Sequence, residues 1–394
     1  MSIFPVAAAK TPVDLEADLL CRHGHEVDRL SVSTAQLKGA GFLRLAAAAA
    51  GTVWSFSGSR AMKQAIARFA PDLIHTHNTF PLLSPSIFWA AKACKKPVVL
   101  TLHNFRLTCA NASLFRDGRP CEKCVAHVPV PALVYRCYKN SLPATAAVVC
   151  MNGLHRRIGT YREKIDAYIT LSEFSKAILV RSGLPPEKIF VKSNFTFDHP
   201  QAAASRSPQV VFAGRISSEK GPQLLLQAWN CVKPFGHKLL IFGDGPDRRD
   251  QQSKYAGDSA VIWLGAQPRK LVIAGLASSR FVVVPSLLYE NMPMVVLEAL
   301  SAGTPVIAPD SGPFPELITH QKEGLLFSRG DADSLAQALR QGINSPSEVW
   351  SEWSRNARQK YVSRFSDEYN YAQLISIYER LLGQHQDSAT GISG

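Results

Sequence analysis

Two glutamates, Glu290 and Glu298, lie on either side of the predicted start of a helix in the second half of the chain. Pro293 can open this helix because its missing N–H would have been unpaired there in any case. The backbone N–H groups of Met294 and Val295 are then free at the positive end of the helix dipole, where they favour an anion. An anion site between two carboxylates suits a sugar nucleotide, with phosphates on the N–H groups and hydroxyls on the carboxylates.

The elements around these glutamates form one predicted strand–helix–strand unit, residues 281–308. The apolar run 281–284 is typical of a strand that is buried on both faces of a parallel sheet. Apolar residues then recur at helical spacing, Gly303 is suited to cap the helix, and Pro305 prevents its continuation. This order places the first glutamate in a loop beside the helix start and the second inside the helix.

Glu290 and Glu298, with seven residues between them and followed by EALSAGTPVIA, resemble the signature of the family-four retaining glycosyltransferases of the GT-B fold, the glycosyl transferases group 1. The resemblance implies that the first glutamate binds hydroxyls of the donor sugar and the second binds the ribose. Family members often have Gly and Phe-Gly after the first glutamate, where this chain has Asn291, Met292 and Pro293. The alternative is two ordinary helix-start acids, which the dipole favours.

A predicted diphosphate site precedes this unit. The sequence QVVFAGRISSEKG indicates a strand that ends at Gly214 and Arg215, with Lys220 beyond a short loop. A guanidinium and an ammonium at the end of a strand match a pyrophosphate. The spacing also resembles the diphosphate-binding pattern of the family, which implies that both cations stabilise the leaving group. Gly243 and Gly245 follow the next strand, where glycine permits close approach of the nucleotide.

Histidines follow two predicted strands in the first half of the chain. His75 and His77 point the same way on one strand, and the strand 97–102 ends in His103. The resemblance places a histidine at this last position in the reaction centre, near the donor sugar and its leaving phosphate. The alternative is a histidine that only satisfies backbone groups at a strand end. A metal held by an isolated His-x-His pair is the weaker interpretation, because it needs further ligands.

Four cysteines follow within a turn-rich segment, residues 109–137. Their order is C-x11-C-x2-C-x12-C, with members Cys109, Cys121, Cys124 and Cys137. The central pair has the spacing of a zinc site, and the outer pair would complete a closed shell of four thiolates with a structural role. The alternative is free or disulfide-linked cysteines. No metal is expected for the catalysis itself, since an Asp-x-Asp pattern at 331–333 lies where acids cap helices.

The length of 394 residues predicts two domains with full-sized cores. We expect an acceptor-binding domain over 1–198, a donor-binding domain over 209–365, a helix over 366–382 that returns to the first domain, and a disordered tail over 383–394. The resemblance implies an α/β GT-B architecture of two Rossmann-like doubly wound domains facing each other across a cleft. The first twelve residues predict at best a poor strand, so the start is either truncated or remodelled.

The net charge of +13 is unevenly distributed. Residues 1–200 hold 25 Lys and Arg against 13 Asp and Glu, while residues 201–394 hold 19 against 18. Such a basic half favours anionic lipid, a phosphate-bearing acceptor or nucleic acid, unless it is an ordinary solvated surface. No nucleic-acid-binding module is recognisable, so no nucleic acid partner is expected. The Ala-rich stretch 42–54, bracketed by Lys38 and Arg60, predicts a packed helix or a peripheral membrane contact.

These observations together predict a retaining hexosyltransferase that uses a nucleoside diphosphate sugar. Its acceptor would be a saccharide or lipid-linked saccharide in envelope polysaccharide biosynthesis. With neither signal peptide nor membrane span evident, we expect a cytoplasmic protein, peripheral on the inner face of the cytoplasmic membrane. The alternatives are a sugar-nucleotide epimerase on the same fold and a basic, zinc-stabilised nucleic-acid-binding protein.

Overall fold

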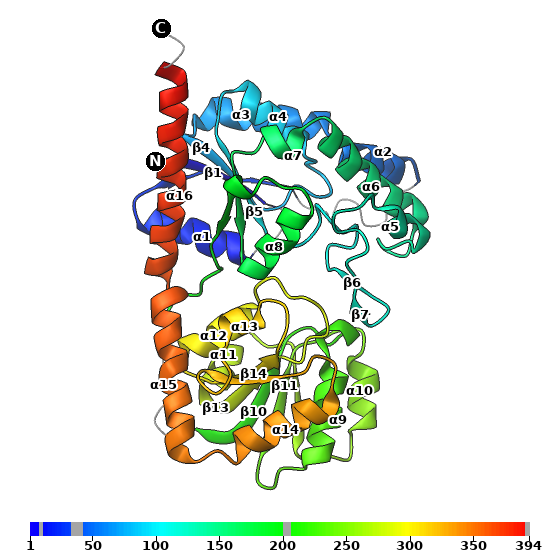
Figure 1. Ribbon diagram of the computed structural model, residues 1–394, viewed down its shortest axis with the longest axis vertical. Coiled ribbons are helices and arrows are strands. Elements are labelled where there is room, and N and C mark those ends of the chain that lie inside the picture. Colours follow the sequence, from blue (N-terminus) through cyan, green and yellow to red (C-terminus); the bar gives the residue numbers. More distant parts are fainter. Residues whose placement is uncertain (8–10, 33–41, 200–205, 391–394) are drawn as a thin grey trace. The chain divides into compact units, whose positions relative to one another are not determined.

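The computed structural model describes the chain apart from residues 8–10, 33–41, 200–205 and 391–394 (Figure 1). The chain divides into two compact units. The first unit comprises Met1–Leu114, Cys121–Ser193 and Tyr371–Gly394, and the second comprises Phe115–Pro120 and Asn194–Asn370. Each unit contains its own parallel sheet and its own apolar core.

Seven parallel strands form the sheet of the first unit, among the residues described. They run in the order β2-β1-β4-β5-β8-β9, with β3 also paired to β1. Their bounds are β1 Ser2–Ala7, β2 Glu26–Val27, β3 Leu30–Ser31, β4 Leu73–Thr76, β5 Val98–Leu102, β8 Ala167–Thr170 and β9 Ile189–Val191. The expectation of a poor strand at the chain start was wrong, because β1 pairs with β2, β3 and β4 and these contacts override its weak propensity.

Helices cover both faces of this sheet, so successive strand residues enter different cores. Ile74 and Val98 pack in one core with α3 and α4, whereas Leu73 and Val99 pack in the other with α1 and α16. The continuous apolar strands follow from this double burial. The bounds of the helices are α1 Thr11–Arg22, α2 Phe42–Val53, α3 Phe56–Phe69, α4 Ser86–Ala93, α5 Val130–Val134, α6 Leu142–Arg157, α7 Thr160–Glu163, α8 Glu173–Arg181 and α16 Asp367–Thr390.

The last helix, α16, packs on the first unit. Leu374, Ile377, Tyr378 and Leu381 lie one turn apart and enter the core with Ile3. We expected residues 383–394 to be a disordered tail, but the helix continues to Thr390. The apolar period ends near Leu382, yet a helix that is already formed extends at little cost.

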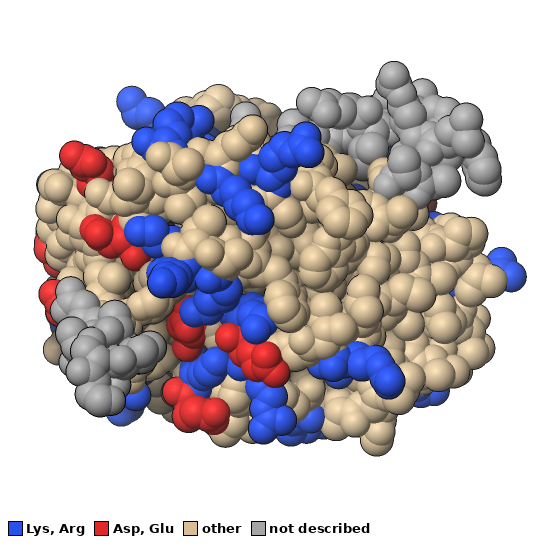
Figure 2. Space-filling view, turned by 90° about the horizontal axis from the view of Figure 1, so that it is seen from above, with Lys and Arg blue, Asp and Glu red and all other residues tan. Residues whose placement is uncertain are grey.

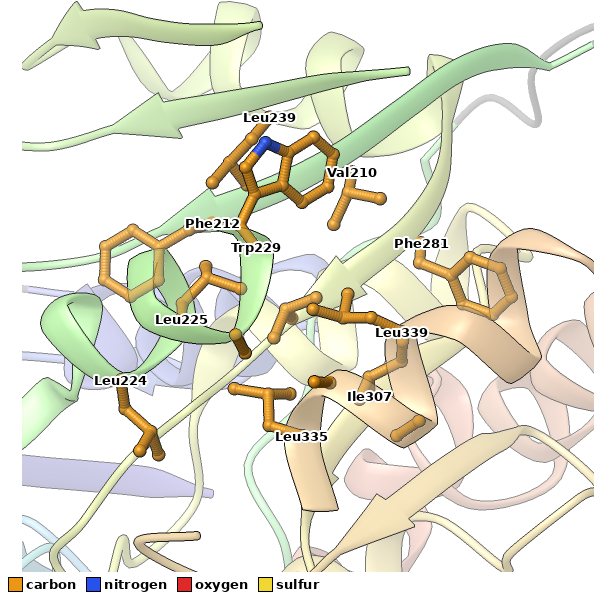
Figure 3. Close-up of a cluster of buried hydrophobic side chains, with 14 of the residues drawn as sticks. Val210, Phe212, Leu224, Leu225, Trp229, Leu239, Phe281, Ile307, Leu335 and Leu339 are labelled. Atoms are coloured by element: carbon orange, nitrogen blue, oxygen red, sulfur yellow. The ribbon is translucent and has the colours of Figure 1, made fainter. Parts of the chain in front are cut away.

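The second unit has six parallel strands within the described residues, in the order β12-β11-β10-β13-β14-β15. They are β10 Ser207–Ala213, β11 Lys238–Phe242, β12 Val261–Gly265, β13 Ser279–Val283, β14 Val306–Pro309 and β15 Gly324–Phe327. Figure 3 shows Trp229 of α9 and Leu339 of α14 packed with Phe281 of β13 in its core. The helices are α9 Pro222–Val232, α10 Arg248–Lys254, α11 Arg269–Ser278, α12 Met294–Ser301, α13 Phe314–Leu317, α14 Ala332–Ile343 and α15 Ser347–Arg364.

A short antiparallel hairpin, β6 Phe115–Arg116 and β7 Arg119–Pro120, interrupts the cysteine-containing segment. The predicted acid-x-acid pattern is a helix cap, as expected: the Asp331 carboxylate accepts hydrogen bonds from the backbone N–H groups of Asp333 and Ser334 at the start of α14.

Candidate functional site

The sheet of the second unit reverses its winding between β10 and β13. From β10 the chain adds β11 and β12 on one side, and from β13 it adds β14 and β15 on the other. In open α/β sheets, ligands bind beyond the carboxyl ends of the strands at such a reversal. The loops after β10 and β13 meet there, because the N–H of Leu287 donates to the carbonyl of Glu219 at 3.0 Å.

Lys220 and Glu290 form an ion pair between these two loops. The Lys220 Nζ lies 2.6 Å from the Glu290 Oε1, and the Ser286 hydroxyl donates to the same oxygen at 2.5 Å. The Glu290 side chain is 11% exposed. Its other oxygen, Oε2, has no hydrogen-bond partner in the part of the chain that the structure describes. It can therefore accept hydrogen bonds from the hydroxyls of a ligand.

Arg215 follows β10 directly and is exposed. Its guanidinium makes no hydrogen bond or ion pair with any residue in the described parts of the chain. An unpaired guanidinium at the carboxyl end of a central strand is available to an anion. The side chain of Lys220 remains one-third exposed despite its ion pair. Two cations therefore lie on the loop after β10. Arg215 can bind an anion without first giving up an ion pair with any of the described residues.

The start of α12 leaves backbone donors free. At the start of this helix, the N–H of Val296 donates to the carbonyl of Pro293 at 3.0 Å. The N–H groups of Met294 and Val295 make no hydrogen bond within the described chain. Both residues are half-buried, so their N–H groups are reachable by a ligand. These donors lie where the sequence predicts an anion site.

Glu298 has a partner that sequence reasoning missed. The Arg269 side chain, at the start of α11, lies 2.8 Å from the Glu298 Oε1 and also donates to it through Nε at 3.0 Å. Burial raises the pKa of the Glu298 carboxyl, and the arginine acts in the opposite direction. A buried carboxylate requires a cation, but the sequence does not say which of several arginines supplies it. The Glu298 Oε2 remains without a partner among the described residues.

Gly243 and Gly245, where we predicted a close approach of the nucleotide, are also required by the chain's own backbone. A Cβ at Gly243 would lie 1.8 Å from the carbonyl oxygen of Gly214, and Gly243 has a φ of +130°. A Cβ at Gly245 would lie 2.1 Å from the carbonyl oxygen of Ile216. The chain's own backbone after β10 occupies the space that these glycines leave.

A chain of buried polar side chains lies at the carboxyl ends of β4 and β5 in the first unit. His77 Nδ1 lies 3.0 Å from His103 Nε2, and His77 Nε2 lies 3.3 Å from Glu16 Oε1. Lys192 contacts the other carboxylate oxygen of Glu16 at 3.0 Å. His103 is half-buried and, with His77, lines a small cavity of about 30 Å³. The predicted reaction-centre histidine is therefore held by a network, and not by backbone groups.

Glu16 and Lys192 were not singled out from the sequence. A signal exists for Glu16, because it follows Val13 by three residues and precedes Leu20 by four, on the apolar face of α1. Burial alone would raise the pKa of the Glu16 carboxyl, but Lys192 and the histidines hold it well below its usual range. Burial lowers the pKa of His75 to about 4 and that of His103 to about 3.

We expect acid to destabilise the first unit. Between pH 6.5, the ordinary histidine pKa, and the folded-state values near 4 and 3, the unfolded chain binds more protons than the folded chain at His75 and His103. Glu16 has the same sign: its contribution is present above pH 4.5 and is lost as the pH falls through its lowered pKa. Each group changes the free energy of unfolding by about 1.4 kcal/mol per pH unit within its own window. Urea unfolding at pH 7, 6 and 5 tests this, and an unchanged midpoint would contradict it.

Glu16, His75 and His77 have ligating atoms within 4.8 Å of one another, which is a geometry that could hold a metal. Two contacts argue against it. His75 Nε2 is already bonded to the Thr101 hydroxyl at 2.7 Å, and Lys192 occupies the carboxylate as its counter-ion. These contacts favour an internal ion-pair network.

The four predicted zinc ligands are outside disulfides and are half-buried in the first unit. Cys124 and Cys137 pack on the same small cluster as Ala110 and Ala132. Burial raises the pKa of the Cys124 thiol to about 11, and the nearby thiols of Cys109, Cys137 and Cys121 add to this rise. The four thiols therefore lie near one another. They do not form as compact a group as the ligating atoms of Glu16, His75 and His77, which lie within 4.8 Å of one another.

Comparison with known proteins gives two family matches. Residues 207–345 match the family model of glycosyl transferases group 1, and residues 13–194 match that of the glycosyl transferase 4-like domain. The 2-deoxystreptamine glucosyltransferase of Streptomyces kanamyceticus is 27% identical over 81% of this chain and 80% of its own length. The amylovoran biosynthesis glycosyltransferase AmsK of Erwinia amylovora is 27% identical over 52% of this chain. Only about half of that relative, 51%, is covered.

Solved structures share the arrangement of elements. Sucrose-phosphate synthase from Thermosynechococcus elongatus superposes with a TM-score of 0.70 at 18% identity, covering 98% of this chain and 100% of its own. HepE of Anabaena, solved in complex with UDP, gives 0.65 at 16% identity, covering 96% and 100%. At these identities the likeness concerns the fold.

Proposed function

The chain belongs to the glycosyl transferases group 1 family and has the GT-B fold, and we propose that it transfers a hexose from a nucleoside diphosphate sugar to a saccharide acceptor with retention of configuration. The observation that carries this proposal is the unpaired Arg215 beside the Lys220–Glu290 ion pair. The cations can bind a diphosphate, and the free oxygen of the neighbouring carboxylate can bind a sugar hydroxyl at the same site.

Each group has a part in the proposed reaction. Negative charge grows on the diphosphate as the glycosidic bond breaks, and Arg215 and Lys220 stabilise it. The N–H groups of Met294 and Val295 bind phosphate oxygens. The free oxygen of Glu290 accepts hydrogen bonds from the sugar, and that of Glu298 accepts them from the ribose. This chemistry requires no bound metal, because protein cations supply the charge.

Thermal-shift measurements with UDP-, GDP- and ADP-glucose test the donor class. A donor that binds only the folded state raises the melting temperature, in proportion to the logarithm of its concentration above the dissociation constant. We expect one nucleotide to raise it and the matching nucleoside monophosphate to raise it less, because the monophosphate lacks the second phosphate. Transfer to a saccharide, with the anomer of the product assigned by NMR, tests retention. Failure of all three donors to shift the transition would contradict the proposal.

We also propose that the acceptor is a lipid-linked saccharide of envelope polysaccharide assembly, reached at an anionic membrane surface. The naming of AmsK for amylovoran biosynthesis supports the polysaccharide class. The excess of lysine and arginine in residues 1–200 supports the membrane surface. Figure 2 shows a face on which lysine and arginine outnumber acidic side chains among broad uncharged areas. Within the described residues, none of the helices has the length and apolar character to span a membrane.

The structure indicates which residues could enter the interface. Val128, Val130 and Val134, at and before α5, are 75%, 54% and 69% exposed. Exposed Lys123, Arg136 and Lys139 lie on the same segment, so apolar and basic side chains are interleaved. The Ala-rich stretch that we considered for this role forms α2, which packs against α6. Thr52 near its end is buried, and Lys38 lies outside the described residues.

Vesicle co-sedimentation tests the membrane proposal. We expect binding to vesicles that contain anionic lipid and loss of binding at high salt, because exposed charges are screened. Val134→Asp should weaken binding severalfold. It places a negative charge in the apolar contact, and this charge offsets the attraction of one basic side chain to the anionic lipid. Val362→Asp is the matched control, because Val362 is 53% exposed on α15 of the second unit. Equal binding by both variants would show that α5 does not contact the membrane. No binding by the wild-type protein would favour a soluble acceptor.

A further inference from the structure

The contacts of His77 determine where the proton of His103 lies. The pKa of Glu16 is held low, so its carboxylate is charged and can only accept hydrogen bonds. His77 Nε2 faces this carboxylate at 3.3 Å and must therefore carry a proton. In a neutral imidazole the other nitrogen, Nδ1, is then an acceptor. It faces His103 Nε2 at 3.0 Å, so His103 must be the donor in that contact.

This assignment leaves His103 Nδ1 without a proton. Burial lowers the pKa of His103 to about 3, so the ring is neutral at physiological pH. Its Nδ1 makes no hydrogen bond within the described parts of the chain. The ring lines the small cavity at the ends of β4 and β5. His103 thus has one free lone pair, and a free lone pair binds a hydroxyl but repels a phosphate oxygen.

We propose that Glu16 and His77 are positioning residues that fix the tautomer of His103, so that its Nδ1 accepts a hydrogen bond from a sugar hydroxyl. The sugar is that of the proposed transferase function, on which this inference rests. Lys192 belongs to the same network. Its ammonium lies 3.0 Å from the other carboxylate oxygen of Glu16 and keeps the carboxylate charged. His75 contacts Glu16 as well, but it also bonds Tyr378 and Thr101 and does not face His103. His75 is therefore a side branch that holds the carboxylate in place.

A charged His77 would reverse the arrangement. Both of its nitrogens would then donate, His103 Nε2 would accept, and His103 Nδ1 would present a proton instead of a lone pair. The Glu16 carboxylate, which is linked to His103 through His77, thus determines whether His103 presents a lone pair or a proton to the ligand. A hydrogen-bonded carboxylate has the same effect in hydrolytic triads, where an amide in its place gives the wrong tautomer.

Long-range ¹H–¹⁵N spectra of histidine-labelled protein test the tautomer without any substrate. The signals of His103 are assigned by their loss in His103→Asn. We expect a proton on Nε2 and none on Nδ1 in the wild-type protein, and a mixture of tautomers in Glu16→Gln, whose amide can donate to His77. Tyr378→Phe is the matched control: it removes a buried hydroxyl from the same cluster, and the tautomer of His103 should not change. A wild-type signal with the proton on Nδ1, or an unchanged signal in Glu16→Gln, would overturn the inference.

Kinetics separate this inference from the proposed function. We expect kcat/KM to fall about 100-fold in Glu16→Gln, in the range expected when a buried hydrogen bond to a substrate hydroxyl is lost, and to stay within a factor of three in Tyr378→Phe. If Glu16→Gln does not fold because Lys192 is left unpaired, the double variant Glu16→Gln/Lys192→Met removes that charge and serves instead. The expected tautomer without any transferase activity in the wild-type protein would overturn the proposed function and leave the proton assignment standing.

The four cysteines carry a second, independent inference. Cys124 and Cys137 pack on the same small cluster, none of the four cysteines is in a disulfide, and the connecting segment includes the short β6–β7 hairpin. We infer that this cluster binds one structural zinc ion, because four thiolates form a closed tetrahedral shell that suits zinc. The sulfur atoms are further apart than in such a shell. Rotation about single Cα–Cβ bonds moves thiols of this kind without rebuilding the backbone.

Elemental analysis of protein purified without chelator tests the zinc site. We expect about one zinc per chain in the wild-type protein, loss of the zinc in Cys124→Ser, and retention in Cys150→Ser, an exposed cysteine of the same unit. Cobalt(II) added to the metal-free protein should give thiolate charge-transfer absorption in Cys150→Ser but not in Cys124→Ser. Protein without zinc that has four reactive thiols, or that has disulfides by mass spectrometry, would overturn the site.

Discussion

Arg215→Ala should lower turnover by two to three orders of magnitude while the free energy of unfolding stays unchanged. The guanidinium has no partner in the described parts of the chain and is exposed, so its removal leaves no buried charge unpaired. Its expected role is to stabilise charge on the leaving diphosphate, where one lost group costs about 2.7–4 kcal/mol of transition-state stabilisation. Turnover at saturating donor and urea unfolding together measure the two effects.

The control for this prediction is Arg355→Ala. Arg355 is another exposed arginine of the second unit, on α15, without a partner among the residues described. Its loss changes the net charge equally and should leave turnover within a factor of two. Near-normal turnover of Arg215→Ala would show that the assigned phosphate site is wrong. Lys220→Ala should lose similar turnover but also stability, because it leaves the buried Glu290 carboxylate without its counter-ion.

Local sequence signals were sufficient for the elements that surround the donor site. The apolar run of β13, the proline before α12 and the glycine after it are consecutive in the chain, so their meaning does not depend on distant residues. The order of those elements alone fixes which loops meet at a strand end. For that reason Arg215, Lys220 and the N–H groups of Met294 and Val295 could be named before any coordinates.

Pairings across the sequence could not be predicted in the same way. Glu298 pairs with Arg269 from another helix, and Glu16 reaches Lys192 across 176 positions. Such partners depend on which strands become neighbours, and several cations satisfy the same general requirement for a buried carboxylate. The strand β1 was expected to be poor for the same reason, because its neighbours supply the stability that its own residues lack.

Gly243→Ala is expected to lower the free energy of unfolding by about 4 kcal/mol or to prevent folding. The added Cβ would lie 1.8 Å from the carbonyl oxygen of Gly214, which is a backbone atom and cannot turn aside as a flexible side chain could. The φ of +130° adds a second cost, because L-residues rarely adopt that conformation. Strain of this kind costs about 1–3 kcal/mol, and overpacking costs a similar amount.

Gly257→Ala is the matched control, since no atom lies within 4 Å of the added Cβ and its φ is not in the left-handed region. It should leave the midpoint of urea unfolding unchanged or slightly raise it, through reduced freedom of the unfolded chain. A near-normal midpoint for Gly243→Ala combined with loss of donor binding would restore the nucleotide as the reason for the glycine. A lowered midpoint with unchanged donor affinity of the folded variant assigns Gly243 to the close approach of the chain after β10 and β11, and the cations and carboxylates then account for donor recognition without it.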